Sequence, residues 1–144
     1  MTSLTLSELS KKMQKIDFCM LSTLASTGAI ATRPMSNNGE VDYDGDIWLF
    51  SYRETRKVAE ILADPRVSLT FTAPPSLLGK PGIFIALEGQ ATLIDDKAAF
   101  AAHWHESLDR WFPQGMATPG LVLIRVHADL AHYWDGEDAG TLRL

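Results

Sequence analysis

The sequence predicts a mainly β protein of the α+β class, built as a six-stranded antiparallel barrel with flanking helices. The chain of 144 residues is 46% hydrophobic and 22% charged, which is the balance of one ordinary globular domain. Roughly six short apolar or alternating segments follow one another, mostly through hairpin-like turns. Helical patterns interrupt these segments without alternating with them, which disfavours a parallel doubly wound sheet. We therefore expect residues 1–144 to form a single domain.

The first half of the chain is expected to hold a helix, a hairpin and a strand followed by a second helix. Thr5 and Glu8 have the spacing of a capping box, and apolar residues at helical spacing predict a short helix that ends near Asp17. Residues 18–23 and 29–35 flank a turn and predict a hairpin, in which Pro34 ends the second strand or marks it as an edge. Residues 47–50 predict a strand, and residues 54–63 predict a helix that Pro65 stops.

The second half is expected to hold three strands and one helix. Residues 67–72 alternate between apolar and polar and predict a strand with one solvated face. Residues 83–95 are long enough for a bent strand, with Gly89 as the expected bulge. Apolar residues at helical spacing predict a helix over 97–111. A last strand over 121–126 leads to residues 131–134, and the residues from Asp135 onward are expected to form a polar tail.

Charge and composition exclude several classes of function. Thirteen Lys and Arg against eighteen Asp and Glu give a net charge of -5, which disfavours nonspecific binding to nucleic acid. No apolar run approaches the roughly 20 residues that span a bilayer, and the N-terminus does not resemble a signal peptide. We therefore expect a cytoplasmic protein without a membrane partner. No metal site is expected, because neither zinc spacing nor a complete EF-hand loop is present. The single cysteine, Cys19, is expected to be a small buried apolar residue.

The junction between the strand at 47–50 and the following helix is the most informative place in the sequence. Ser51 and Glu54 again have capping-box spacing, which would place free N–H groups and the positive end of a helix dipole beside a hydroxyl and two cations. A phosphate monoester carries about -1.5 to -2 charges and needs several donors with cationic compensation. The alternative is a well-capped helix with basic residues on its solvated face. We define the candidate anion site as Arg33, Thr55, Arg56 and Lys57.

The chain as a whole resembles the flavin-binding split barrels that include pyridoxamine 5'-phosphate oxidase and the general stress protein 26 group. The resemblance covers nearly the whole sequence and depends on the order and spacing of several segments. These segments are residues 21–23, 33–35, 48–51, 55–57, 64–67, 88–91, 111–115, 123–126 and 133–135. The segment at 111–115 and the last strand resemble the stress-protein branch most.

The resemblance implies a split barrel that forms a homodimer, with FMN, or FAD as the alternative, at each of two subunit interfaces. The positions implied to contact the cofactor are Arg33, Thr55, Arg56 and Lys57 for the phosphate and ribityl groups, and Met35, Phe50 and Ser51 along the flavin ring. An aromatic residue of the other subunit, Trp111 or Trp134, is implied to cover the ring. An apolar slot beside a fixed cationic pocket suits such a cofactor.

Three functions follow from this resemblance. The first is a stress-related flavin-dependent oxidoreductase in which the cofactor carries the redox chemistry, although no side chain is identified as catalytic. The second is a flavin carrier or sensor without turnover. The third is a genuine pyridoxamine 5'-phosphate oxidase, or a reductase linked to F420 or NAD(P)H. After Trp134 the chain offers three carboxylates and only Arg143, which would oppose a phosphorylated substrate. We therefore expect no true pyridoxamine-phosphate oxidation.

Overall fold

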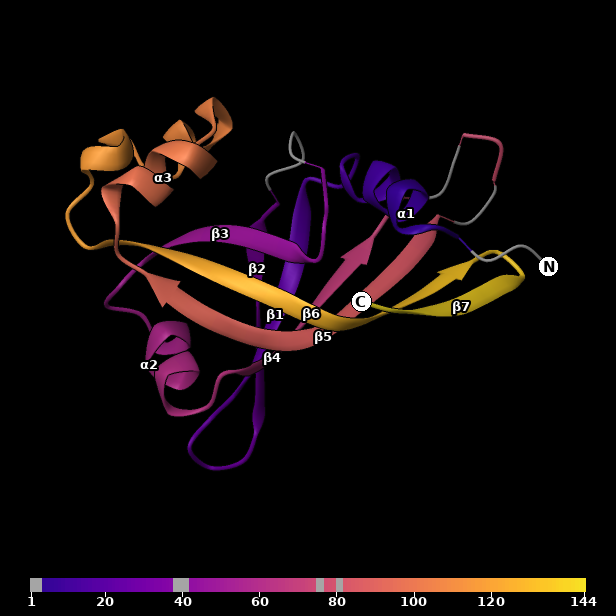
Figure 1. Cartoon of the computed structure of the whole chain (residues 1–144), viewed down its shortest axis with the longest axis horizontal. Coiled ribbons are helices and arrows are strands. Elements are labelled where there is room, and N and C mark those ends of the chain that lie inside the picture. The colour runs from indigo at the N-terminus through magenta and orange to yellow at the C-terminus, as the bar shows by residue number, and fades with distance from the viewer. Residues whose placement is uncertain (1–3, 38–41, 75–76, 80–81) are drawn as a thin grey trace.

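One antiparallel sheet of seven strands organises the molecule (Figure 1). The computed structural model describes residues 4–37, 42–74, 77–79 and 82–144. The elements are, in chain order, α1 (Leu6–Met13), β1 (Phe18–Leu24), β2 (Ile30–Ser36), β3 (Asp46–Tyr52), α2 (Arg56–Ala63), β4 (Arg66–Thr72), β5 (Ile83–Ile94), α3 (Lys97–His103), the 3₁₀ helices η1 (Glu106–Arg110) and η2 (Gly115–Ala117), β6 (Leu121–Asp135) and β7 (Asp138–Arg143).

The strands follow the order β2-β1-β4-β5-β6-β3, and β7 pairs with β6 outside this path. Each pairing is antiparallel. The strongly curved strands β5 and β6 cross the whole molecule, and the sheet is coiled rather than flat (Figure 1). Within the described residues no pairing joins β2 to β3, so the barrel is open between these strands. The predicted fold class is confirmed, with seven strands in place of six.

The N-terminal elements follow the sequence pattern closely. The backbone N–H of Glu8 donates to the Thr5 hydroxyl (3.2 Å), as the capping spacing predicted. The helix α1 ends at Met13, however, and not near Asp17; Ile16 is buried in the turn that follows. The hairpin of β1 and β2 is confirmed, and Pro34 lies on β2, the terminal strand of the sheet, where a residue without an N–H is tolerated.

Two predictions in the second half are wrong. The helix predicted over 97–111 breaks at Trp104, which has extended backbone angles, and the side chain of His105 caps a separate 3₁₀ helix by accepting from the N–H of Ser107. The polar tail from Asp135 is in fact the strand β7, because Gly136 adopts a positive φ and turns the chain back onto β6. The bulge at Gly89 is confirmed; a Cβ there would collide with the His127 carbonyl.

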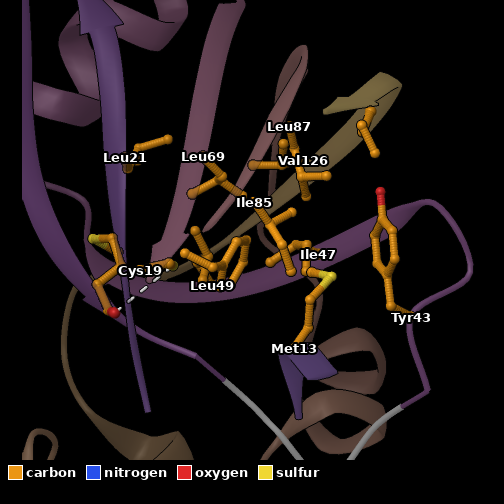
Figure 2. Close-up of a cluster of buried hydrophobic side chains, with 14 of the residues drawn as sticks. Met13, Cys19, Leu21, Tyr43, Ile47, Leu49, Leu69, Ile85, Leu87 and Val126 are labelled. Atoms are coloured by element: carbon orange, nitrogen blue, oxygen red, sulfur yellow. Dashed lines mark hydrogen bonds between the residues drawn. The ribbon is translucent and has the colours of Figure 1, made fainter. Parts of the chain in front are cut away.

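The main core lies on the concave side of the sheet and is closed by α1. Figure 2 shows its tightly packed apolar side chains, among them Leu21, Leu69, Ile85 and Leu87, with Cys19 at the margin. The Cys19 thiol donates to the Met35 carbonyl (3.8 Å), and burial raises its pKa to about 12. This agrees with the expectation of an apolar role for Cys19.

A second, smaller core lies under α3 and η1 and supports the site described below. It consists of Phe50, Phe100, Leu108, Phe112, Leu121 and Leu123. No helix in the described part of the chain is long and apolar enough to cross a membrane.

Candidate functional site

An apolar pocket of about 250 Å³ opens where the end of β3 meets the β1–β2 pair, the start of α2 and the segment around η1. We call it the aromatic pocket. Its lining residues are Phe18, Pro34, Met35, Ser36, Phe50, Ser51, Tyr52, Lys57, Leu108, Trp111 and Phe112. The pocket thus combines residues that are far apart in the sequence, and it has a mainly apolar wall with one cation.

The floor of the pocket is rigidly packed. Phe50 is only 7% exposed, and its ring centroid lies 5.7 Å from Phe100 and 4.9 Å from Trp104, both in edge-to-face geometry. Such aromatic pairs are favoured arrangements and add to the free energy gained by burial. Phe50 is therefore held in place by the second core and gives the pocket a fixed apolar surface.

The rim consists of three half-exposed aromatic residues. Phe18 and Trp111 stand nearly perpendicular with centroids 6.1 Å apart. The Tyr52 hydroxyl donates to the Trp111 carbonyl (3.3 Å), which ties the end of β3 to the segment after η1. Exposed aromatic area around a pocket is typical of a surface that a flat ligand or a second protein chain covers.

Lys57 is the cation in the lining of this pocket. Among the described residues, no carboxylate lies within ion-pair distance of its ammonium. Burial lowers the pKa of Lys57, and the nearby positive charge of Arg33 lowers it further. A half-buried ammonium without a counter-ion is a favourable partner for an anionic ligand.

A buried carboxylate, Glu60, organises the other two cations. Glu60 is 8% exposed, and its Oε1 accepts from the Thr23 hydroxyl (2.9 Å) and from Nη2 of Arg33 (3.1 Å). Its Oε2 accepts from Nε of Arg56 (2.9 Å). Nη1 of Arg33 also donates to Thr23 Oγ1 (2.7 Å) and to the Leu21 carbonyl (3.3 Å). We call Thr23, Arg33, Arg56 and Glu60 the Glu60 cluster.

The protonation of Glu60 reflects two opposing effects. Burial alone would raise the pKa of its carboxyl group. Hydrogen bonds from Thr23, Arg56 and Arg33, together with the charge of Arg56, outweigh burial and lower that pKa below its ordinary value. The carboxylate is therefore ionised at neutral pH and offsets part of the positive charge of the anion site.

The residues predicted from the sequence separate into groups in space. Five of them line the aromatic pocket, namely Met35, Phe50, Ser51, Lys57 and Trp111. Arg33 and Arg56 belong to the Glu60 cluster. Thr55 precedes α2, and its hydroxyl donates to the Tyr52 carbonyl (3.0 Å). Trp134 is outside the pocket lining; it lies far along β6, opposite Phe84 of β5.

The capping box predicted for Ser51 and Glu54 is wrong. Ser51 pairs with Val122 inside the ladder of β3 and β6, so β3 extends through Tyr52. The helix α2 begins only at Arg56, with Thr55 as its N-cap residue. The Ser51 hydroxyl is buried and donates to the Tyr52 carbonyl (3.1 Å). Ladder pairing with β6 therefore prevails over the local capping preference.

Sequence reasoning missed Glu60, Thr23, Phe18 and Tyr52. The spacing of Arg56 and Glu60, four residues apart on a helix, is the signal that could have indicated their ion pair. Thr23 approaches Glu60 only because β1 packs against α2, and no sequence spacing encodes this contact. Phe18 and Tyr52 occupy strand ends, where local pattern does not show which face is covered.

Comparison with known proteins identifies a family for this chain. Residues 5–143 match the family described as pyridoxamine 5'-phosphate oxidase like. A search among curated protein sequences finds no match. A Clostridium acetobutylicum protein related to general stress protein 26 of B. subtilis, of the pyridoxinephosphate oxidase family, shares 19% identity with a TM-score of 0.80, over 96% of this chain and 94% of that chain. This likeness shows a common fold.

Two further structures differ in the ligand that their names give. The general stress FMN/FAD binding protein of Xanthomonas citri is 26% identical with a TM-score of 0.74, over 92% of this chain and 89% of that chain. A heme binding protein of Mycobacterium smegmatis is 14% identical with a TM-score of 0.77, over 99% of this chain and 60% of that chain. The second likeness again concerns the fold.

Proposed function

This chain belongs to the pyridoxamine 5'-phosphate oxidase like family, and we propose that it is a flavin-binding protein of the general stress protein 26 type that takes FMN, with FAD as the alternative. The observation that carries the proposal is one pocket that joins an apolar aromatic slot to the ammonium of Lys57, for which the described residues offer no carboxylate partner. The name of the 26% identical Xanthomonas citri protein points to the same ligand class.

The residues of the pocket fit the two chemically different parts of a flavin mononucleotide. Phe50, Met35 and Trp111 offer apolar and aromatic surface for a planar ring. Lys57 and the neighbouring Arg33 offer positive charge for a phosphate. In this proposal the protein binds and orients the ring against β3 and keeps water from its inner face.

We also propose that the functional unit is a homodimer. The pocket of about 250 Å³ is smaller than the roughly 300–1,000 Å³ of complete ligand sites, so one chain supplies part of an enclosure. Exposed apolar side chains, namely Phe18, Met20, Phe84 and Trp134, lie on β1, β5 and β6 and are suited to an interface core. Because Trp134 is outside the pocket of its own chain, it would cover a ring bound by the second copy.

The proposed activity is that of a flavin-dependent oxidoreductase, because a bound flavin would supply redox chemistry that the side chains lack. No residue is assigned a catalytic role. The second candidate, a flavin carrier or sensor without turnover, is favoured by the acidic turn of the β6–β7 hairpin, whose carboxylates would oppose a phosphorylated substrate. A spectrum recorded with NAD(P)H or reduced F420 under anaerobic conditions separates the two, since bleaching of the flavin indicates an electron donor.

The first experiment identifies the ligand. We expect the purified protein to be yellow and to release a compound with the mass of FMN or FAD. Release of haem, or of no chromophore together with failure to bind added FMN, would contradict the proposal. Light scattering of the loaded protein at micromolar concentration is expected to report a dimer, and a flavin-loaded monomer would refute the proposed assembly.

The second experiment tests the site. Lys57→Met removes a charge-assisted contact typically worth about 1.5–3 kcal/mol, so the affinity for FMN is expected to fall roughly tenfold to a hundredfold. Lys11→Met, on the exposed surface of α1, is the matched control and should leave the affinity unchanged. Equal dissociation constants for wild type and the Lys57 variant would place the phosphate elsewhere.

A further inference from the structure

We propose that Glu60 determines which cation of the anion site meets a bound phosphate: it holds Arg33 and Arg56 in internal ion pairs and leaves Lys57 as the cation that binds the ligand. This inference rests on the proposed function, because it concerns the same site. It assigns a positioning and selectivity role to a residue that does not itself line the aromatic pocket.

Arg56 is directed away from the aromatic pocket. Neighbouring residues on a helix differ by about 100° in direction, and only Lys57 of this pair lines the pocket. Arg56 lies instead beside a separate cleft between α2 and the β1–β2 turn, together with Glu60 and Asp64. Its side chain is 69% exposed, and its Nε is engaged by Glu60 one helical turn further on. Its charge is therefore both paired and screened by solvent.

Arg33 is fixed from three sides. Its guanidinium donates to the Leu21 carbonyl, to the Thr23 hydroxyl and to Glu60, all within 3.3 Å. These acceptors belong to β1 and α2, so the orientation of Arg33 is set before any ligand binds. Its charge reaches Lys57, whose pKa it lowers, which means that the two cations share one neighbourhood.

The net charge of these four side chains follows from their contacts. Arg33, Arg56 and Lys57 together with the carboxylate of Glu60 leave two net positive charges. Arg56 adds little of this charge at the aromatic pocket, because it is exposed and paired with Glu60. A phosphate monoester, with about -1.5 to -2 charges at neutral pH, therefore meets mainly the charges of Lys57 and Arg33. Without the charge of Glu60, no carboxylate of the Glu60 cluster would offset the positive charge of Arg33, and the site would hold a phosphate more tightly.

The test is the ratio of the affinities for FMN and riboflavin, which differ only in the phosphate. Glu60→Gln keeps the size of the side chain and an oxygen that accepts from Thr23 and Arg33, but it removes the charge. We expect the FMN-to-riboflavin ratio to rise about threefold to tenfold, as for removal of one opposing unit charge near a partly solvated site. The affinity for riboflavin should stay the same.

The matched control is Asp64→Asn. Asp64 follows α2 directly, and its carboxylate is paired with Arg66, outside the Glu60 cluster. The same change of charge at this position should leave the ratio unchanged. An unchanged or lower ratio in Glu60→Gln would overturn the inference, since Glu60 would then act only as a scaffold for Arg33.

A second variant keeps the test decisive if Glu60→Gln fails to fold. Arg56→Met alters an exposed side chain and is expected to lower the ratio by no more than about threefold, because an exposed charge is screened. Lys57→Met is expected to lower it by at least about tenfold. Equal losses in the two variants would show that Arg56 also holds the phosphate and would refute the division of roles.

The outcomes also separate this inference from the function on which it rests. If Lys57→Met leaves the FMN-to-riboflavin ratio unchanged, the proposed phosphate site itself is wrong. If Lys57→Met lowers the ratio while Glu60→Gln fails to raise it, the flavin site stands and the role of Glu60 is refuted.

Discussion

Arg56 and Lys57 are adjacent in the sequence and carry the same charge, yet they lie in different surroundings. Lys57 lines an apolar pocket and has no carboxylate partner among the described residues. Arg56 is exposed and bound to Glu60. The comparison shows that a run of cations in a sequence is not a cluster in space, because a helix distributes consecutive side chains around its axis. A motif that lists charges without their counter-ions therefore overstates how many are available to a ligand.

The two regions are also held together by different forces. The aromatic pocket depends on the burial of Phe50 and its neighbours, which is non-directional and scales with apolar area. The Glu60 cluster depends on a few directional bonds to one carboxylate. Substitutions should therefore affect the pocket through lost volume and the cluster through unsatisfied polar groups.

The largest expected effect is the loss of stability in Phe50→Ala. Truncation of a buried Phe typically costs about 3–5 kcal/mol, and Phe50 is enclosed by Phe100 and Trp104. Urea unfolding followed by tryptophan fluorescence measures the change. Leu62→Ala, on the exposed side of α2, is the control and should cost far less. If both variants lose the same stability, the pocket floor is not part of the cooperative core.

A smaller loss is expected in the Glu60 cluster from Thr23→Val. This change keeps the shape of the side chain but leaves buried oxygen and N–H groups of Glu60 and Arg33 without one partner, which costs about 1–3 kcal/mol. Thr70→Val, on the outward face of β4, is the matched control. A Thr23 variant as stable as the wild type would mean that water replaces these bonds.

The sequence allowed much of the fold to be predicted, and its failures have a physical cause. The Thr5 cap, the β1–β2 hairpin and the Gly89 bulge follow from local chemistry and were correct. The helix over 97–111 was wrong because helical spacing of apolar residues does not reveal the extended backbone of Trp104. The strand β7 was missed because its polar sequence is ordered by pairing with β6, which is a tertiary contact.

The sequence allowed only part of the candidate site to be predicted, because some of its contacts are tertiary. Met35, Phe50, Ser51, Lys57 and Trp111 were named from the family resemblance, and the structure places them around one pocket. Glu60 could not be assigned its partners, since Thr23 and Arg33 reach it across β1, β2 and α2. Trp134 was also named from the family resemblance, but within a single chain it pairs with Phe84 on β5 and does not line the pocket.

A still smaller effect is expected from the titration of Glu60. Because its pKa is lower in the folded protein than in the unfolded chain, the cluster contributes stability above the ordinary glutamate pKa, and this contribution is lost as the pH falls through the folded value. Glu60→Gln should therefore flatten the acid limb of a plot of stability against pH. Thermal unfolding between neutral and strongly acidic pH measures this. Asp64→Asn serves as a comparison, because in the wild type hydrogen bonds from Arg66 lower the pKa of the Asp64 carboxyl group to about 2. Parallel acid limbs for wild type and Glu60→Gln would contradict the prediction.

The aromatic pocket and the opposite end of β6 differ in charge, and for this reason we expect no sustained oxidation of pyridoxine 5'-phosphate. At that end Asp135 lies 3.6 Å from the ammonium of Lys12, while Glu137 and Asp138 are exposed at the turn. Arg143 pairs with Leu130 at the far end of β7, away from these carboxylates. A phosphorylated substrate needs several cationic contacts, and without that binding energy nothing orients its reacting carbon against the ring. Flavin-loaded protein incubated in air with pyridoxine 5'-phosphate should therefore form neither pyridoxal 5'-phosphate nor peroxide beyond one equivalent. Sustained turnover at low micromolar substrate would show that the acidic hairpin does not exclude the substrate, and that the pocket alone supplies both phosphate sites.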